Sequence, residues 1–327
     1  MRISGKTLVN LFVILLLFLF SRIGILTFNL WSQVEDLKET KISDIGFLSA
    51  HFLRYLLVKP IYILSDLYQV EAGTLFTFLN LIFLVFIANL MLAIAEQKTT
   101  IEFTNPSITL ILAYGFIISV ATQMNGRLMF AILGFCLLVF VNLAWELSKI
   151  STLNTFLINI VALFLLSVSS GTLLSGLLFL TLWVIGFRDR KLTLGVLVGY
   201  LVVLLAITPL VVILTNKVLK FHGGWLNVLT HGVGNLFFVF DRYTFYLLLI
   251  LILVLLLNFG LASFLFLSYV ASSKTLIAVL VAGISMLFVG YSGFTVTLPT
   301  LVALGLSYFR FRISPHINST KKLRSYS

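Results

Sequence analysis

The sequence predicts an all-α, polytopic integral membrane protein with about ten transmembrane helices. Of its 327 residues, 60% are apolar and only 10% are charged, and the mean hydropathy is +1.14. A soluble domain of this size must keep much of its surface polar, and so few charges cannot cover it. Apolar runs close to 20 residues long recur between short charged segments, which is the pattern of helices that cross a bilayer.

The apolar runs define one transmembrane domain over residues 1–308, followed by a basic cytoplasmic tail over residues 309–327. The chain begins with basic residues and an apolar run, like a signal peptide. Its run continues too far and no Ala-x-Ala pattern follows, so we expect a retained first span. The predicted spans are Leu8–Trp31, Thr74–Ala95, Ser107–Thr122, Leu128–Trp145, Leu153–Val168, Thr172–Phe187, Leu192–Leu214, Tyr243–Tyr269, Thr275–Val289 and Phe294–Tyr308.

The distribution of basic residues predicts the orientation. With a cytoplasmic N-terminus, the inside segments hold thirteen basic residues and the outside segments hold eight, while Arg22 lies within the first span. Cytoplasmic loops of membrane proteins carry an excess of lysine and arginine. Ten spans then place both termini in the cytoplasm. The inside basic residues are Arg2, Lys6, Lys98, Lys149, Arg188, Arg190, Lys191, Lys274, Arg310, Arg312, Lys321, Lys322 and Arg324.

The segment 44–72 is predicted to lie on the external side without crossing the membrane. Within Phe47–Leu67, polar residues recur every three or four positions and so share one face of a helix. Pro60 should break or kink that helix. Counting the segment as a span would reverse every later loop. We therefore expect an interfacial helix or a re-entrant pair of half-helices, with His51, Tyr55, Lys59, Tyr62 and Asp66 on the polar face.

Several kinds of chemistry have no sequence signature here. The single cysteine, Cys136, lies inside a span and excludes a disulfide framework. P-loop, dinucleotide-binding, HExxH and paired Asp-x-Asp motifs are absent from the sequence. His222 and His231 lie nine residues apart with no third ligand beside them. We expect no metal and no cofactor, and the basic excess reflects topology and not a nucleic-acid partner.

One short hairpin contains a residue that the hairpin itself does not require. The segment Gln123–Arg127 separates two membrane-length apolar runs, and its last residue is an arginine at the mouth of the second run. A tight turn needs glycine or asparagine, but it does not need a guanidinium. Arg127 is therefore a functional candidate. The alternative is an anchoring arginine whose side chain reaches the lipid headgroups.

Charged and histidine side chains gather at the outer side of this topology. Few of them are strong acids, and several cations together suit an anionic phosphate or diphosphate group. Arg22 is a charge well inside an apolar run, so we expect it to face a partner or a water-filled cavity. The outer residues are Arg22, Glu35, Asp36, Asp44, His51, Arg54, Lys59, Asp66, Glu71, Arg127, Lys217, Lys220, His222, His231, Asp241 and Arg242.

This layout resembles the polytopic polymerases of bacterial exopolysaccharide and O-antigen assembly. Asp44-Ile45-Gly46-Phe47 leads into an apolar helix, and Arg127-Leu128-Met129-Phe130-Ala131 matches an Arg-x-x-apolar-Ala pattern at the start of a span. About forty residues later comes a hydroxyl-rich turn, Ser167 to Thr172, where many of these polymerases carry a His-Ser pair and this chain has Ser169-Ser170. A basic turn, Arg188–Lys191, and a late external loop over residues 215–242 with His231 complete the resemblance, which covers residues 40 to 240.

The resemblance implies a metal-independent glycosyltransferase at the outer face of the bacterial cytoplasmic (inner) membrane, in O-antigen, capsule or exopolysaccharide synthesis. Such enzymes join oligosaccharide repeat units carried on polyprenyl diphosphate, and the diphosphate bond supplies the driving force. The partners implied are that lipid-linked oligosaccharide, membrane lipid, a chain-length regulator and a flippase. The residues implied are Arg127 and Arg54 for the diphosphate, Arg22 or Arg242 assisting, Lys59, Ser169 and Ser170 as further contacts, and His231, Asp66 or His51 as the base.

Two other functions remain open from the sequence. A transporter or flippase of a lipid-linked or anionic solute would also have a charged cavity, but its charges should continue through the membrane midplane. A non-catalytic membrane subunit would leave each external arginine replaceable. The gathering of charge on one side favours an enzyme or receptor at the outer surface.

Overall fold

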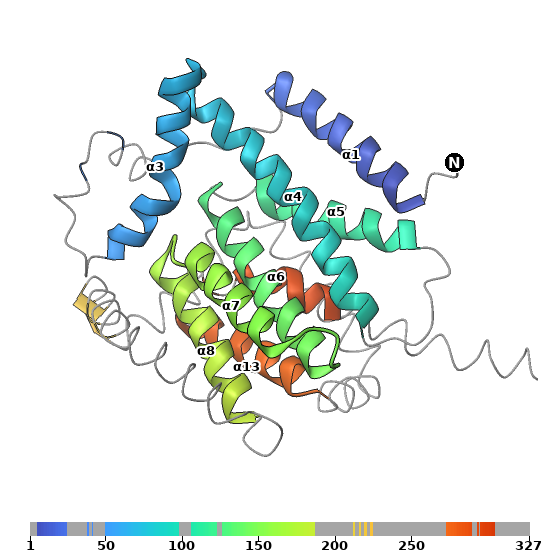
Figure 1. Cartoon of the computed structure of the whole chain (residues 1–327), viewed down its shortest axis with the longest axis vertical. Coiled ribbons are helices and arrows are strands. Elements are labelled where there is room, and N and C mark those ends of the chain that lie inside the picture. The colour runs from blue at the N-terminus through green and yellow to red at the C-terminus, as the bar shows by residue number, and fades with distance from the viewer. Residues whose placement is uncertain are drawn as a thin grey trace, which may run out of the picture.

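A computed structural model describes residues 5–24, 50–97, 106–122, 126–186, 273–289 and 295–304, with residues 38, 41, 212, 216, 219, 220, 223, 224 and 293 as isolated positions. The predicted spans Leu192–Leu214 and Tyr243–Tyr269, most of the loop 215–242 and the tail 309–327 lie outside them. The regular secondary structure of the described residues is helical throughout, which confirms the all-α fold class (Figure 1).

The helices follow the apolar runs within a few residues, except that the first ends early. Charged or turn-forming segments separate the helices. Along each apolar run, helical hydrogen bonds satisfy the backbone N–H and C=O groups, as apolar surroundings require. The helices are α1 (Gly5–Arg22), α3 (Ala50–Tyr68), α4 (Ala72–Gln97), α5 (Pro106–Thr122), α6 (Arg127–Glu146), α7 (Thr152–Leu166), α8 (Ser170–Gly186) and α13 (Lys274–Val289), with a further helical segment at Thr295–Leu304.

Three of these helices, α1, α4 and α6, are long and apolar enough to cross a membrane by length and composition. The others in the described part of the chain are shorter apolar helices, apart from α3, which does not qualify as a span. These findings indicate a membrane protein.

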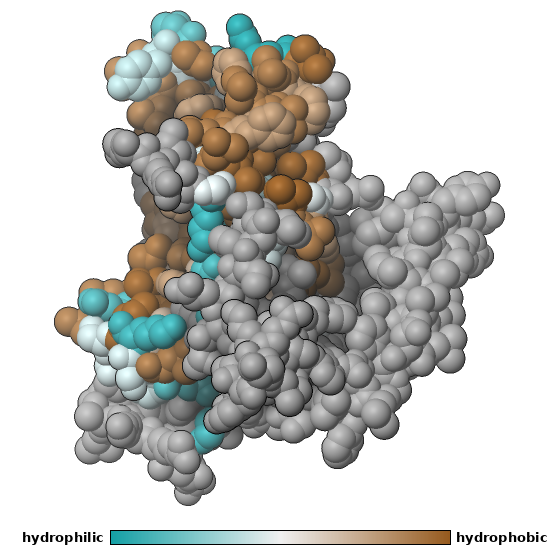
Figure 2. Space-filling model, turned by 90° about the vertical axis from the view of Figure 1, so that its right-hand side faces the viewer, coloured by the Kyte–Doolittle hydropathy of each residue, from teal (hydrophilic) through white to brown (hydrophobic). Residues whose placement is uncertain are grey.

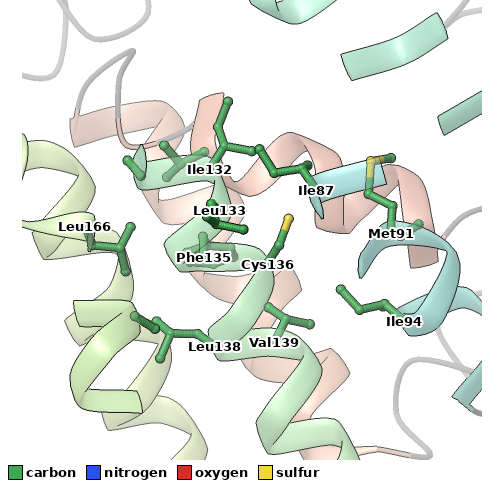
Figure 3. Packing of buried hydrophobic residues seen from close by; sticks show 14 of the residues in the cluster. Ile87, Met91, Ile94, Ile132, Leu133, Phe135, Cys136, Leu138, Val139 and Leu166 are labelled. Carbon is green, nitrogen blue, oxygen red and sulfur yellow. The ribbon is translucent and has the colours of Figure 1, made fainter. Parts of the chain in front are cut away.

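Helix α6 lies at the centre of the described core. Its apolar side chains are almost all buried, and α4 and α7 pack on different sides of it (Figures 1 and 3). Figure 3 shows Ile87 and Met91 of α4 beside α6, while Leu166 of α7 lies across the helix from them. Gly134 lets α7 come close, because a Cβ there would lie 2.7 Å from the carbonyl oxygen of Ala162.

The packing gives the bundle two distinct ends. Helix α7 returns antiparallel to α6, since Asn142 pairs with Asn159 and Trp145 Nε1 donates to Thr152 Oγ1 at 3.0 Å. Helix α8 runs back in the opposite direction to α7. Its Trp183 therefore contacts Trp145 at the end of α6, edge to face, with the ring centroids 5.2 Å apart. The start of α6, the end of α7 and the start of α8 therefore share one end, which we call the arginine end.

The opposite end carries charged residues that pair with one another or with backbone. Lys6 forms an ion pair with Glu96 at 3.0 Å. Glu146, at the end of α6, accepts hydrogen bonds from Ser273 Oγ and from the backbone N–H groups of Lys274 and Thr275 at the start of α13. A carboxylate stabilises the positive end of a helix dipole. The distribution of basic residues predicts that Lys6, Glu96, Glu146 and Lys274 lie on the same side of the membrane. That this side faces the cytoplasm remains a prediction.

Helix α3 contradicts one of its two predicted forms. It is one continuous helix through Pro60, so the prediction of two half-helices is wrong. A proline costs one backbone hydrogen bond, which the rest of a long helix can offset. Of the residues on the predicted polar face, Tyr55 and Tyr62 are buried against the protein and Asp66 is exposed, while Leu56 and Leu67 are exposed as well. An apolar outer face is expected where the surroundings are lipid.

Arg22 is the last residue of α1, and so of this candidate span, and not a charge in its interior, which corrects its predicted place within a run from Leu8 to Trp31. Gly24 has a φ of 74°, and its backbone N–H bonds back to Ser21. A glycine in this left-handed conformation commonly ends a helix. Arg22 is exposed there, where a cation interacts favourably with the negative end of the helix dipole.

The described surface has a broad apolar region. Figure 2 shows apolar residues covering much of the upper body, with hydrophilic residues gathered at its tip and lower down. Exposed large apolar side chains lie along several helices, at Leu11, Phe12, Leu15, Phe18, Phe78, Ile82, Phe86, Leu153, Leu157 and Val161. So large an exposed apolar surface fits contact with lipid.

The close approach at Gly134 gives a stability prediction. Gly134→Ala should destabilise the protein by about 1–3 kcal/mol, because the new Cβ meets backbone that cannot move without separating α6 from α7. Thermal unfolding of the detergent-purified protein measures the effect. Gly115→Ala on α5 is the matched control, since its Cβ would meet nothing within 4 Å. Equal unfolding temperatures for the two variants would contradict the predicted packing.

Candidate functional site

Three segments that are far apart in the sequence meet at the arginine end. Arg54 comes from α3, Arg127 is the first residue of α6, and the turn 167–169 joins α7 to α8. Arg54 Nε donates a hydrogen bond of 2.9 Å to the carbonyl oxygen of Val168 in that turn. The structure therefore brings together the two arginines and the hydroxyl-rich turn that the sequence predicts as parts of one site.

The turn uses its own hydroxyl groups to hold its shape. Ser167 Oγ donates to the carbonyl of Phe164 at 2.6 Å, and Thr172 Oγ1 bonds to the carbonyls of Leu166 and Ser169. These bonds fix the turn by satisfying carbonyls that a helix end leaves without an intrahelical partner. The carbonyl of Val168 is the one presented to Arg54. The hydroxyl groups of Ser167 and Thr172 therefore stabilise the conformation of the turn, which accounts for their presence there.

Arg54 is sheltered from water, with 6% of its surface exposed. Burial lowers the pKa of its guanidinium from the ordinary value, because the charged form loses hydration. Arginine nevertheless keeps its proton in proteins. The hydrogen bond to Val168 and the burial fix a permanent cation at this position.

The second cation lies close to the first. Arg127 is half-buried, and its charge and that of Arg54 repel each other. Two like charges held away from bulk water raise the free energy of the site, since the low dielectric strengthens their interaction. An anion bound between them would relieve that repulsion.

Helix dipoles add to the positive potential at this end. Helices α6 and α8 both begin here, and neither has an acidic residue in its first turn. The first N–H groups of a helix and its positive dipole end favour an anion and disfavour a cation. Arg127 stands at the start of α6 against this preference, which is a costly place for an arginine that only anchors a helix.

Other predicted site residues on α3 lie at different distances from this cluster. His51 belongs to α3 one turn before Arg54. Lys59 Nζ donates to the carbonyl of Lys38 and lies 5.6 Å from the ring centroid of Tyr55. Asp66 is exposed and twelve residues beyond Arg54, about 18 Å along the helix. The structure therefore separates Asp66 from the two arginines.

The remaining predicted residues are placed less fully. Ser169 is half-buried in the α7–α8 turn and Ser170 is the first residue of α8, so both belong to the arginine end. Arg22 is exposed at the end of α1. His231 and Arg242 lie outside the described residues, and so does the whole Asp44-Ile45-Gly46-Phe47 motif that precedes α3.

Two groups at this end were missed from the sequence. The carbonyl of Val168 is a backbone group, and the sequence does not predict which carbonyl of a turn accepts a hydrogen bond from another helix. Asn80 is a fully buried amide on the face of α4 that packs against the first turns of α6. An asparagine inside an apolar run could have indicated this residue, because burying an amide costs free energy unless it is hydrogen-bonded.

The donor set does not favour a metal. Within the described ranges, no group of three histidine, cysteine, aspartate or glutamate residues lies close enough to hold an ion. The cluster instead offers guanidinium N–H groups and backbone N–H groups at helix starts. Such donors bind a phosphate or diphosphate by charge-assisted hydrogen bonds.

No protein-family model matches the chain, and comparison with curated proteins and with solved structures gave no match either.

The cluster predicts anion binding that can be measured without knowing the reaction. Millimolar inorganic diphosphate should raise the unfolding temperature of the detergent-purified protein, because a ligand that binds the folded state stabilises it. Arg127→Ala should remove most of that shift. Lys149→Ala is the control, since Lys149 is an exposed cation in the turn at the other end of α6. An equal loss in both variants would show general charge attraction and no site.

Proposed function

We propose that the chain is a metal-independent glycosyltransferase that joins polyprenyl-diphosphate-linked oligosaccharide repeat units in surface polysaccharide synthesis. In this proposal it has about ten spans, works at the outer face of the bacterial inner membrane and keeps both termini in the cytoplasm. The arginine end then faces outward, towards the lipid-linked substrate, and a flippase and a chain-length regulator act beside it.

The observation that carries the proposal is the meeting of Arg54, Arg127 and the α7–α8 turn at one end of an apolar bundle. A buried guanidinium and a half-buried one lie where two helices begin. A diphosphate at the headgroup level of a membrane has the charge and the hydrogen-bond acceptors that such a site needs. The opposite end contains Lys6, Glu96 and Glu146, whose charges pair with side chains or backbone.

The reaction requires charge stabilisation and one proton acceptor. A hydroxyl of the acceptor sugar attacks the anomeric carbon of the donor, the new glycosidic C–O bond forms, and the C–O bond to the diphosphate breaks. Polyprenyl diphosphate leaves with the bonding electrons, and Arg54 and Arg127 stabilise the charge that develops on it. A base takes the proton of the attacking hydroxyl.

On α3, His51 is the candidate base that we retain, because its position in the helix is three residues, about one turn, before Arg54. Asp66 is about 18 Å further along the same helix and exposed, and we leave it out of the proposed site. His231 remains a candidate of the late external loop.

Arg127 gives the direct test of this function. Arg127→Ala, introduced in place of the wild-type chain in cells, should abolish long glycan chains while single lipid-linked repeats and protein level persist. Arg127→Lys should restore only part of the activity, because a lysine keeps the charge but loses the bidentate fork. Gel separation of the extracted polysaccharide measures chain length. A normal ladder from Arg127→Ala would contradict the assignment.

The same cells separate a polymerase from a transporter. If the chain moved the lipid-linked repeat across the membrane, Arg127→Ala would leave the repeats on the cytoplasmic side, out of reach of a membrane-impermeant lectin or oxidant applied to spheroplasts. The proposal expects the repeats to be labelled at the outer face in that variant.

The histidine on α3 makes a second, narrower test. His51→Gln should lower the rate of chain growth by two orders of magnitude or more, the usual scale for removing a general base. Asp66→Asn on the same helix should leave the rate within about twofold, since Asp66 is remote from the arginines. Protein level and unfolding temperature are measured for both. The reverse result would assign the base to Asp66.

A further inference from the structure

Asn80 has a buried hydrogen-bond acceptor that the rest of the described protein leaves unused. Its side chain is fully buried, and its Nδ2 donates to the carbonyl of Phe76 one turn earlier at 2.8 Å. Only the amide nitrogen can donate to a carbonyl, so this bond fixes which way the carboxamide points. Oδ1 then accepts no hydrogen bond from any residue that the structure describes. A buried acceptor without a donor costs about 1–3 kcal/mol.

Two other asparagines of the bundle show what normally fills this position. Asn89 and Asn142 make the same backbone bond to the carbonyl one turn earlier, at 2.8 and 2.7 Å. In each of them Oδ1 accepts a hydrogen bond from an asparagine of a neighbouring helix, Asn10 and Asn159 respectively. In both, Nδ2 donates to a carbonyl of the same helix and Oδ1 accepts from a donor on a neighbouring helix. Asn80 makes the bond within its own helix, but its Oδ1 accepts none from the described residues.

The open acceptor lies level with the start of α6. Asn80 is placed between Phe76 and Phe83 on α4, and the rings of both contact the ring of Phe130, with centroids 6.1 and 4.8 Å away. Helix side chains lean towards the N-terminus and cover the preceding turn. The ring of Phe130 therefore lies over the turn that Arg127 begins, and Asn80 is opposite that turn.

We propose that Asn80 is a positioning residue for Arg127. When an anion occupies the arginine end, Asn80 Oδ1 accepts a hydrogen bond from the Arg127 guanidinium and fixes the plane of its fork towards the anion. An arginine carries five N–H donors, so one can bind Asn80 while others bind the ligand. The unfilled acceptor is kept at a cost to stability because it orients a functional cation. This proposal rests on the proposed function, since it needs an anion at that end.

A double-mutant cycle tests the coupling, with inorganic diphosphate as the probe and isothermal titration of the full chain in detergent as the measurement. Asn80→Ala should weaken diphosphate binding about tenfold where Arg127 is present. In an Arg127→Lys background, which has no fork to orient, Asn80→Ala should change the affinity less than about twofold. That difference corresponds to a coupling near 1 kcal/mol.

Stability provides an independent readout and a second variant. Asn80→Leu removes the acceptor and fills its space, so without ligand it should unfold at the same temperature as wild type or higher. Asn142→Leu is the matched control, because it leaves the buried Asn159 without its partner and should lower the unfolding temperature while diphosphate affinity is retained.

Each other result overturns the proposal in a distinct way. Unchanged affinity in Asn80→Ala would show that Oδ1 meets water alone. Equal losses in the wild-type and Arg127→Lys backgrounds would show that Asn80 touches the ligand directly. A wild-type chain that does not bind diphosphate would instead remove the proposed function, and Asn80→Leu would then be only a stabilising change.

Discussion

The cost of burying a polar group away from water is the constraint on which most of this structure depends. Almost every buried amide, hydroxyl or charge in the described helices is closed by a specific partner, such as Asn142 by Asn159, Glu146 by the start of α13, and Arg54 by Val168. In surroundings as apolar as these, such bonds align neighbouring helices more strictly than apolar contacts can. Several of these bonds join neighbouring helices, as Asn142 and Asn159 join α6 and α7.

The arginine end is the place where this rule is strained. Arg54 and Arg127 repel each other, and Arg127 opposes the dipole of its own helix. Asn80, on the facing side of α4, adds an acceptor with no donor. Three unfavourable features at one location are hard to explain by stability alone, since apolar residues would pack there at lower cost. They are explained together if the folded protein is adapted to a bound anion.

Much of the fold could be predicted from the sequence because each span is a local feature. An apolar run flanked by turn-forming or charged residues satisfies its backbone within itself, so the bounds of α4, α6 and α7 agree with the predicted runs within three residues. For α3, the alternative of two half-helices was wrong, because the sequence shows that Pro60 removes one backbone hydrogen bond but not that the helix continues on both sides of it. The candidate site was predicted as a set of residues, and Arg54, Arg127 and the turn 167–169 do come together.

The sequence by itself determined that the chain is helical and apolar, where most of its described helices begin and end, and that cations collect on one side of a predicted membrane. These properties depend on composition and on neighbours a few residues away. Only the tertiary structure decided that Val168 presents its carbonyl to Arg54, that Asp66 lies far from the arginines and that the phenylalanines on either side of Asn80 contact Phe130 of α6. These contacts and distances involve residues up to 114 positions apart. They depend on how the helices pack, and helix packing cannot be predicted from a local sequence pattern.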